Sequence, residues 1–426
     1  MKKIVLFIIF GLTLLTVKLI FASPGVTVGE INEKTLTLVD CYKLALKQSE
    51  LIAVDLEKIK QAESHFTQAL GTALPQISFS RSDTRNYSEI SKSSNISFEQ
   101  KFIFKQTLFS GFKEFAGMAG SRLEKQQREN ETRWAEQLLF LDVSDAFYLL
   151  LELREDLKAL ETIKTSIEDR IKDLKTREEL GKSRKSETVT NEVQLYNIEA
   201  AVMDDKRQEA VAKELLEFLI GQPVAEITES NIDMSLREET DYMKYANSRP
   251  DVKAAELQWK TDKKRSTVAK SGLFPTVTVE SDYYNHRTSS PTDSDWSTIL
   301  NIDVPIFSGT TTFGQITEAN LVAKQSQLLS KRALRSAVSD IHNIYTNVVM
   351  LKSQTELLSK ALNSAEINYT LQLKDYKSNL VNNLDVLTAL QDWETAKRNY
   401  INISYETKRF YWQLLVVSNN LKLEIK

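Results

Sequence analysis

The fold is decided by a stretch that opens with LPQISF at residues 74–79 and closes with FSG at residues 109–111. A second copy opens with FPTVTV at residues 274–279 and closes with FSG at residues 307–309. In each copy a helical pattern stops at a proline, two alternating segments follow, and a Ser-Gly pair opens a new helical pattern. The strand–helix junctions are therefore Pro75, Gly111, Pro275 and Gly309. Pro275 follows Pro75 by 200 positions, far above the period of about 20 to 50 residues in solenoid repeats, so we predict a duplicated half-molecule.

The composition is typical of long helices rather than of several globular domains. The 426 residues include 12 glycines and 7 prolines, and Ala, Leu, Lys, Glu, Gln and Ser dominate the central segments. The formal net charge is −3 and the two signs alternate along the chain, which argues against nucleic-acid binding. A single cysteine, Cys41, excludes an intramolecular disulfide. We expect Cys41 to be a small buried residue rather than a lipid-modified one, because Asp40 precedes it where a small residue is required.

The N-terminal residues 1–22 have the pattern of a secretory signal peptide. Two lysines precede an apolar run at residues 4–17, and Ala22 and Ser23 offer a cleavage site. We expect the mature chain to leave the cytoplasm. Beyond this run we find no stretch of about 18 consecutive apolar residues, so we predict no transmembrane helix in the mature chain.

The first repeat covers residues 23–220. We expect a helix over residues 36–72, a strand hairpin over residues 76–109, and a helix from residue 113 to residue 180 that would be about 100 Å long. Residues 181–186 form a turn, and a return helix runs to residue 220 before Gly221. Spacings of three and four indicate a coiled-coil stripe on the long helix. Its members are Leu153, Leu157, Leu160, Ile163, Ile167, Ile171 and Leu174.

A connector at residues 221–248 leads to the second repeat, residues 249–426. This repeat contains a helix to residue 271, a strand hairpin over residues 276–307, and two further long helices with a turn near residues 378–383. We expect the first strand of the first hairpin to rise into a loop at its polar end, Arg81 to Arg85, and the last strand of the second to reach Ile306. The final helix carries a heptad stripe. Its members are Val386, Ala389, Trp393, Ala396, Tyr400, Ile403, Thr407, Phe410, Leu414 and Val417.

The predicted strands suit a membrane. Their length of about 9 to 12 residues matches a tilted crossing of a bilayer, and their alternation fits a barrel wall. Four strands cannot close, since about eight already make a narrow barrel, so we expect three chains to supply twelve. The rival interpretation is a coiled-coil scaffold with two small hairpins, which leaves the membrane-length strands unexplained.

The chain resembles the TolC-like outer-membrane efflux protein family. The markers follow one order along nearly the whole mature chain: LPQ at 74–76, FSG at 109–111, RPD at 249–251, FPT at 274–276, VPIFSG at 304–309 and NLDVL at 383–387. The resemblance implies a mainly α fold with transmembrane β: a homotrimer with a twelve-stranded barrel in the outer membrane of a Gram-negative-type bacterium and a periplasmic tunnel of helices. It also implies a passive, gated duct without cofactors, which works with a periplasmic adaptor and an inner-membrane pump of RND, ABC or MFS type.

Site residues follow from the resemblance. Asp385 stands where the family places an aspartate ring at the pore constriction, and Tyr376 matches a tyrosine that latches the closed state. Val381 occupies the position of an expected arginine, and Thr388 that of a second aspartate. The adaptor is expected to dock on the tips between the long helices, and the candidate residues there are Gly181, Lys182, Ser183, Arg184, Asn379 and Asn382.

Enzymatic function is not predicted. His65, His286 and His342 are widely scattered and lack the spacing of a zinc site. The GKS at residues 181–183 lacks the earlier glycine of a phosphate-binding loop, because Thr176 stands there. The alternatives left open are a duct for type I protein secretion, a periplasmic coiled-coil adaptor, and a scaffold protein.

Overall fold

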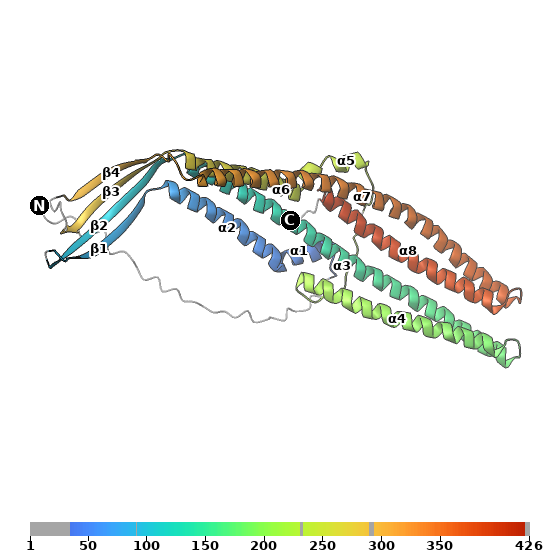
Figure 1. Ribbon diagram of the computed structural model, residues 1–426. Coiled ribbons are helices and arrows are strands. Elements are labelled where there is room, and N and C mark those ends of the chain that lie inside the picture. Colours follow the sequence, from blue (N-terminus) through green and yellow to red (C-terminus); the bar gives the residue numbers. More distant parts are fainter. Residues whose placement is uncertain (1–34, 91, 231–232, 289–293, 422–426) are drawn as a thin grey trace.

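The chain folds into an elongated rod with a sheet at one end and two helical hairpins at the other (Figure 1). The computed structural model describes residues 35–90, 92–230, 233–288 and 294–421, so the predicted signal peptide lies outside the described residues. The helices, in chain order, are α1 (Leu38–Gln48), α2 (Glu50–Ala73), α3 (Lys113–Glu179), α4 (Lys185–Ile220), α5 (Glu239–Met243), α6 (Pro250–Lys270), α7 (Thr311–Lys377) and α8 (Asn383–Val417), with short 3-10 turns η1 (Ala246–Ser248) and η2 (Ser271–Leu273).

Four antiparallel strands form one sheet in the order β1-β2-β3-β4. They are β1 (Gln76–Ser88), β2 (Ser93–Ser110), β3 (Thr276–Arg287) and β4 (Trp296–Asp303). The central pair, β2 with β3, joins the two repeats through partners such as Phe102 and Tyr283. The first repeat therefore supplies one half of the sheet and the second repeat supplies the other, as the duplication predicts.

Two strand boundaries differ from the prediction. The polar end of β1 stays in the sheet, where Arg81 is the register partner of Gln100 on β2. The side chain of Arg81 also forms an ion pair with Asp83 of the same strand at 3.0 Å. β4 ends at Asp303 rather than at Ile306. Pro305 explains this early end, because proline has no N–H to donate to a ladder.

The long helices follow the sequence pattern closely. Helices α3 and α7 each contain 67 residues, which corresponds to about 100 Å of helix. Most of the α3 stripe is buried, from Leu153 to Leu174. The prediction of one helix over residues 36–72 is wrong in one respect: this segment forms two helices, α1 and α2. Ser49 causes the break: it caps α2 by accepting a hydrogen bond from the Ile52 N–H at 3.3 Å.

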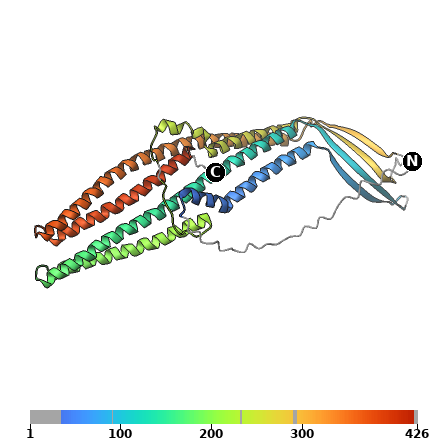
Figure 2. The same ribbon diagram turned by 180° about the vertical axis from the view of Figure 1, so that it is seen from behind.

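The helices lie side by side in a layer (Figure 2), and no other described element covers either edge of this layer. Toward the tips the order is α4, α3, α8, α7, and toward the sheet it is α2, α3, α6, α7. The main core lies at the middle of the rod, where Cys41 of α1 and Phe140 of α3 are fully buried. The connector crosses the outside of the second repeat there, since Tyr411 donates to the Asp233 carbonyl at 3.0 Å.

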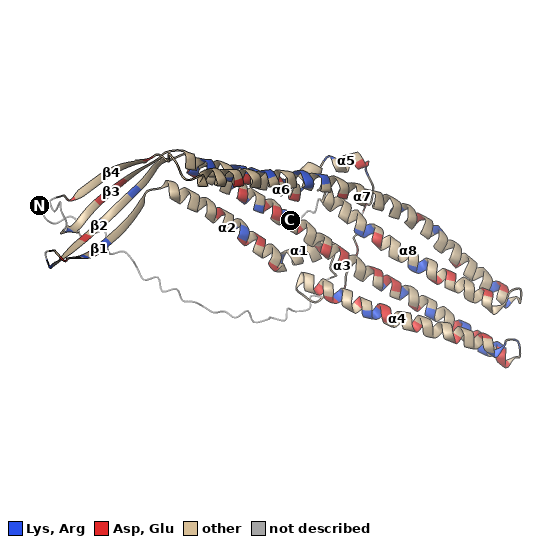
Figure 3. Ribbon diagram, viewed as in Figure 1, with Lys and Arg blue, Asp and Glu red and all other residues tan. Residues whose placement is uncertain are grey.

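Charged residues of both signs occur along the whole length of the helices, as Figure 3 shows. Their alternation agrees with solvated helix faces rather than with a patch of one sign. Among the described residues, no helix combines the length and the apolar character that a membrane crossing would need.

Candidate functional site: the hairpin tips

The two hairpins end close together at the far end of the rod from the sheet (Figure 1). Helix α3 turns into α4 through Gly181, whose φ is 71°, and α7 turns into α8 through Asn379, whose φ is 59°. Glycine and asparagine are the residues that adopt this left-handed conformation most readily at a helix end. The two turns therefore lie where the sequence predicts them. Their predicted docking residues are exposed except for Ser183, which is partly buried and donates to Glu187 at 2.9 Å.

Asp385 caps helix α8. Its backbone N–H donates to Oδ1 of Asn382 at 3.0 Å, and the Asn382 N–H donates back to Oδ2 of Asp385 at 3.0 Å. This reciprocal capping box satisfies two N–H groups that the first helical turn leaves without partners. Asp385 and Thr388 are both exposed. Within one chain Asp385 thus acts as a cap, and its place in a pore ring stays a prediction.

Tyr376 holds three helices together at the tips. It is 7% exposed, and the guanidinium groups of Arg170 and Arg177 lie 3.7 and 4.7 Å from the centroid of its ring. Its hydroxyl donates to Oε2 of Glu187 at 3.2 Å. Each cation over an aromatic face contributes about 0.5–2 kcal/mol. Tyr376 of α7 is therefore fastened to both α3 and α4.

Arg170 also fastens α3 to α8, a role that sequence reasoning missed. Its Nη2 and Nε donate to Oδ1 of Asn383 at 2.9 and 3.3 Å, and its Nη1 donates to Asp173 at 3.1 Å. Burial lowers the pKa of Arg170 even though Tyr376 and Asp173 favour its charged form, but an arginine stays protonated in proteins. A signal was present in the sequence, since Arg170 interrupts the buried stripe between Ile167 and Ile171.

Val381, which occupies the position of the expected arginine, places no cation beside Tyr376. Val381 packs with Leu174, Tyr376 and Val386 in a small apolar cluster. The cations that contact Tyr376 come from α3 instead. The tip contacts join the two hairpins of a single chain.

The strand–helix junctions lie at the opposite end of the helices from the tips. Gly111 has a φ of 63° and Gly309 a φ of 62°, and each is followed by a second left-handed residue, Phe112 or Thr310. A Cβ on Gly111 would lie 2.7 Å from the Cβ of Phe274, whereas a Cβ on Gly309 would meet open space. The first junction is therefore packed against the second repeat. Pro75 and Pro275 each stand two positions after the last residue of a helical segment, which is Ala73 of α2 or Leu273 of η2.

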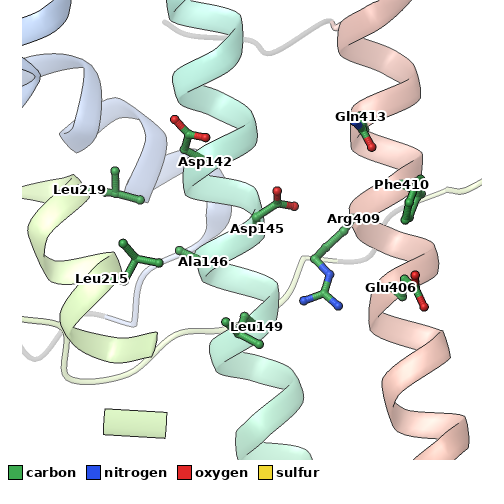
Figure 4. A pocket seen from close by; sticks show the side chains of 10 residues that line it. All are labelled: Asp142, Asp145, Ala146, Leu149, Leu215, Leu219, Glu406, Arg409, Phe410 and Gln413. Atoms are coloured by element: carbon green, nitrogen blue, oxygen red, sulfur yellow. The ribbon is translucent and has the colours of Figure 1, made fainter. Parts of the chain in front are cut away.

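A groove of about 620 Å³ lies farther along the hairpins, between α3, α4 and α8 (Figure 4). Asp142 and Asp145 line it beside aliphatic side chains such as Leu215, and burial raises the pKa of both carboxyl groups. In the part of the chain that the structure describes, no group of three or more His, Cys, Asp or Glu side chains is arranged to hold a metal ion.

Comparison with known proteins identifies the fold. A probable outer membrane lipoprotein of Salmonella typhimurium, SilC, is 24% identical over 162 residues, which make up 37% of this chain and 35% of SilC, so the match spans about a third of that relative. The solved structure of CusC superimposes with a TM-score of 0.82 at 14% identity, covering 89% of this chain and 91% of CusC. The outer membrane protein VceC of Vibrio cholerae gives a TM-score of 0.80 at 20% identity, covering 90% of this chain and 96% of VceC.

The family assignment rests on the sequence of both repeats. The sequence model of the outer membrane efflux protein family matches residues 41–222 and 242–418. The matched segments contain both strand hairpins and both tips. The resemblance seen in the sequence markers is thereby confirmed: the chain belongs to the outer membrane efflux protein family.

Proposed function

We propose that three copies of the chain assemble into a passive, gated duct that carries substrates across the outer membrane and the periplasm from an inner-membrane pump. The observation that carries this proposal is that, among the described residues, both edges of the sheet and of the helical layer are unpaired. Closure of such a structure requires further copies, and three copies supply twelve strands.

The sheet has the two faces of a barrel wall. On one face the rings of Phe79 and Phe102 lie 5.2 Å apart, and exposed Leu300 continues the apolar surface. On the other face Lys101 pairs with Asp282 at 2.7 Å. An apolar face toward lipid and a polar face toward a lumen are what a transmembrane barrel requires. The free edges of β1 and β4 would pair between neighbouring copies, because lipid does not tolerate an open edge.

The edge helices have matching apolar stripes. Helix α7 exposes apolar side chains at spacings that are multiples of seven: Val322, Leu329, Met350, Leu357 and Leu371. Helix α4, on the opposite edge, exposes Val189, Val193, Tyr196, Met203, Val211, Leu215 and Phe218. A seven-residue repeat is the pattern of packed coiled-coil helices. We place the tip half of α7 in one copy against α4 of the next copy, and the sheet half of α7, which carries Val322 and Leu329, against α2.

The gate of the duct would lie at the tips. Three Asp385 carboxylates about 6 Å apart would repel by about 3 kcal/mol per pair at an effective dielectric constant of about 20, which favours a bound cation. Tyr376 and its two arginines would hold the hairpins in the closed arrangement. The polar tips around Lys182 and Asn379 would receive a periplasmic adaptor, and the pump would supply the energy.

Single-channel recording in a planar bilayer tests this function. Detergent-extracted, folded protein should give small, cation-selective conductance steps. Folded protein that forms no channels over a range of lipid compositions would refute the duct and favour the scaffold.

A further inference from the structure

A second ionic contact joins the hairpins well away from the tips. Arg398 of α8 lies about 22 Å along the helix from Asn383, at about 1.5 Å per residue. Its Nε and Nη2 donate to Oδ2 of Asp156 on α3 at 2.9 and 2.7 Å. Its Nη2 also lies 3.3 Å from Oδ2 of Asp205 on α4. One guanidinium therefore contacts both helices of the first hairpin.

The contact is largely shielded from solvent on the carboxylate side. The side chains of Asp156 and Asp205 are 14% and 5% exposed, and that of Arg398 is 36% exposed. Two carboxylates thus share one cation. When both are ionised, the contact holds one excess negative charge in a site with little water, which is unfavourable.

The surrounding charges do not remove this excess. On α3, Glu152 accepts from Asn402 at 2.9 Å and pairs with Arg409 at 3.1 Å. On α4, Asp204 pairs with Arg207 at 2.7 Å. On α8, Glu394 lies close enough to Arg398 and Asp156 to interact with their charges, and its burial raises its pKa. Arg398 is therefore the cation that Asp156 and Asp205 share.

We propose that Arg398 is a positioning residue that fastens the second hairpin to the first, and that a proton held by Asp205 beside Asp156 sets how firmly it does so. With the proton present, the two carboxyl groups hydrogen-bond to each other and one guanidinium faces one negative charge. Without it, the two carboxylates repel each other across the α3–α4 contact. The hairpins are tighter in mild acid than at neutral pH.

The direction in which the stability of this contact changes with pH follows from proton linkage. Burial, and then the hydrogen bond shared with Asp156, raise the pKa of Asp205 to about 6. The folded contact therefore binds the proton more tightly than an unfolded chain does, and its stabilisation is lost as the pH rises through about 6. Between about pH 5 and about pH 7.5 this linkage amounts to about a tenfold change in the opening equilibrium.

Hydrogen exchange read by mass spectrometry tests the contact in the full-length protein in detergent. After correction for intrinsic exchange rates, residues 194–209 and 391–402 should be about tenfold better protected near pH 5 than near pH 7.5. Asp205→Asn keeps the shape of the protonated side chain, so protection should stay high and equal at both pH values. Asp392→Asn, on an exposed position of α8 within the second of these segments, is the matched control and should keep the pH dependence of the unaltered protein. Arg398→Lys should lower protection at both pH values, because lysine lacks the planar fork that reaches two carboxylates.

Equal protection of the unaltered protein at both pH values would overturn the proposal, and so would an undiminished pH dependence in Asp205→Asn. The exchange test does not depend on the duct. Its consequence for conductance rests on the proposed function: channels should close more as the pH falls through about 6, and not in Asp205→Asn. If the exchange depends on pH but the protein forms no channels, the proposal for the Arg398 contact holds and only the proposed duct is refuted.

Discussion

Single side chains at the tips decide how the two hairpins are held together. Arg170 contacts both Tyr376 and Asn383, so one residue of α3 fixes both helices of the second hairpin. Arg177 adds a second cation over the same ring. We infer that the loss of Arg170 affects the tips more than the loss of any one of its contacts.

Arg170→Ala should therefore increase conductance more than Tyr376→Phe. The first change removes a cation–π contact and two hydrogen bonds to Asn383, whereas the second removes only the hydroxyl that donates to Glu187 at 3.2 Å. Each lost contact is expected to cost about 0.5–2 kcal/mol. Single-channel recording of both variants shows which of them has the larger increase in conductance. If Tyr376→Phe has the larger effect, the Glu187 bond rather than the arginine holds the tips.

Asp385→Asn separates the two roles of this residue. An asparagine oxygen still accepts from the Asn382 N–H, so helix α8 keeps its cap, but the charge is lost. Cation selectivity and block by divalent cations should fall, whereas thermal stability should change by less than about 1 kcal/mol. Asp392→Asn, also exposed on α8, is the control for a lost carboxylate. Unchanged cation selectivity in Asp385→Asn would mean that Asp385 does not form the pore constriction.

Whole elements meet at the strand–helix junctions, where two equivalent glycines have different surroundings. Both Gly111 and Gly309 have a positive φ, so alanine is strained at each by about 1 kcal/mol. At Gly111 the added Cβ would also lie 2.7 Å from Phe274 and 2.9 Å from the Ser271 carbonyl. The duplicated motif is thus equal in backbone conformation and unequal in packing.

Gly111→Ala should destabilise the protein by about 1–3 kcal/mol more than Gly309→Ala, because only the first variant must displace neighbouring atoms. Thermal unfolding of the two variants in the same detergent measures the difference, and each variant serves as the control for the other. Equal losses would mean that backbone strain alone governs the junctions.

At the scale of the whole molecule, the proposed trimer depends on the apolar stripe of α7. Leu357→Glu places a charge in the middle of this exposed stripe and should convert the trimer to smaller species. Ser359→Glu introduces the same charge on an exposed polar position of α7 that lies about 200° around the helix from Leu357. Analytical ultracentrifugation in detergent should show loss of the trimer in the first variant only. A trimer that survives Leu357→Glu would place the contact on another face.

Local sequence determined the elements of this protein and their order. Alternation predicted the strands, and a 3.6-residue pattern predicted the long helices; the turns near Gly181 and Asn379 lie where their left-handed backbone needs such residues. These signals depend only on neighbours along the chain, so they can be read from the sequence without knowing how the helices pack. The same signals missed the break at Ser49, because a single capping serine inside a helical pattern is a weak one.

Only the tertiary structure decided which distant side chains meet. Arg170 and Asn383 lie 213 positions apart, and Arg398 and Asp156 lie 242 positions apart, yet each pair forms hydrogen bonds. Such contacts depend on how the two repeats are placed side by side, and this placement follows from packing over the whole length of the helices. Helical periodicity tells which face of α3 is buried but not which helix covers it. For that reason the family resemblance could point to Tyr376 and Asp385 as candidates, whereas only the fold brought Arg170, Arg177 and Arg398 to the contacts between the hairpins.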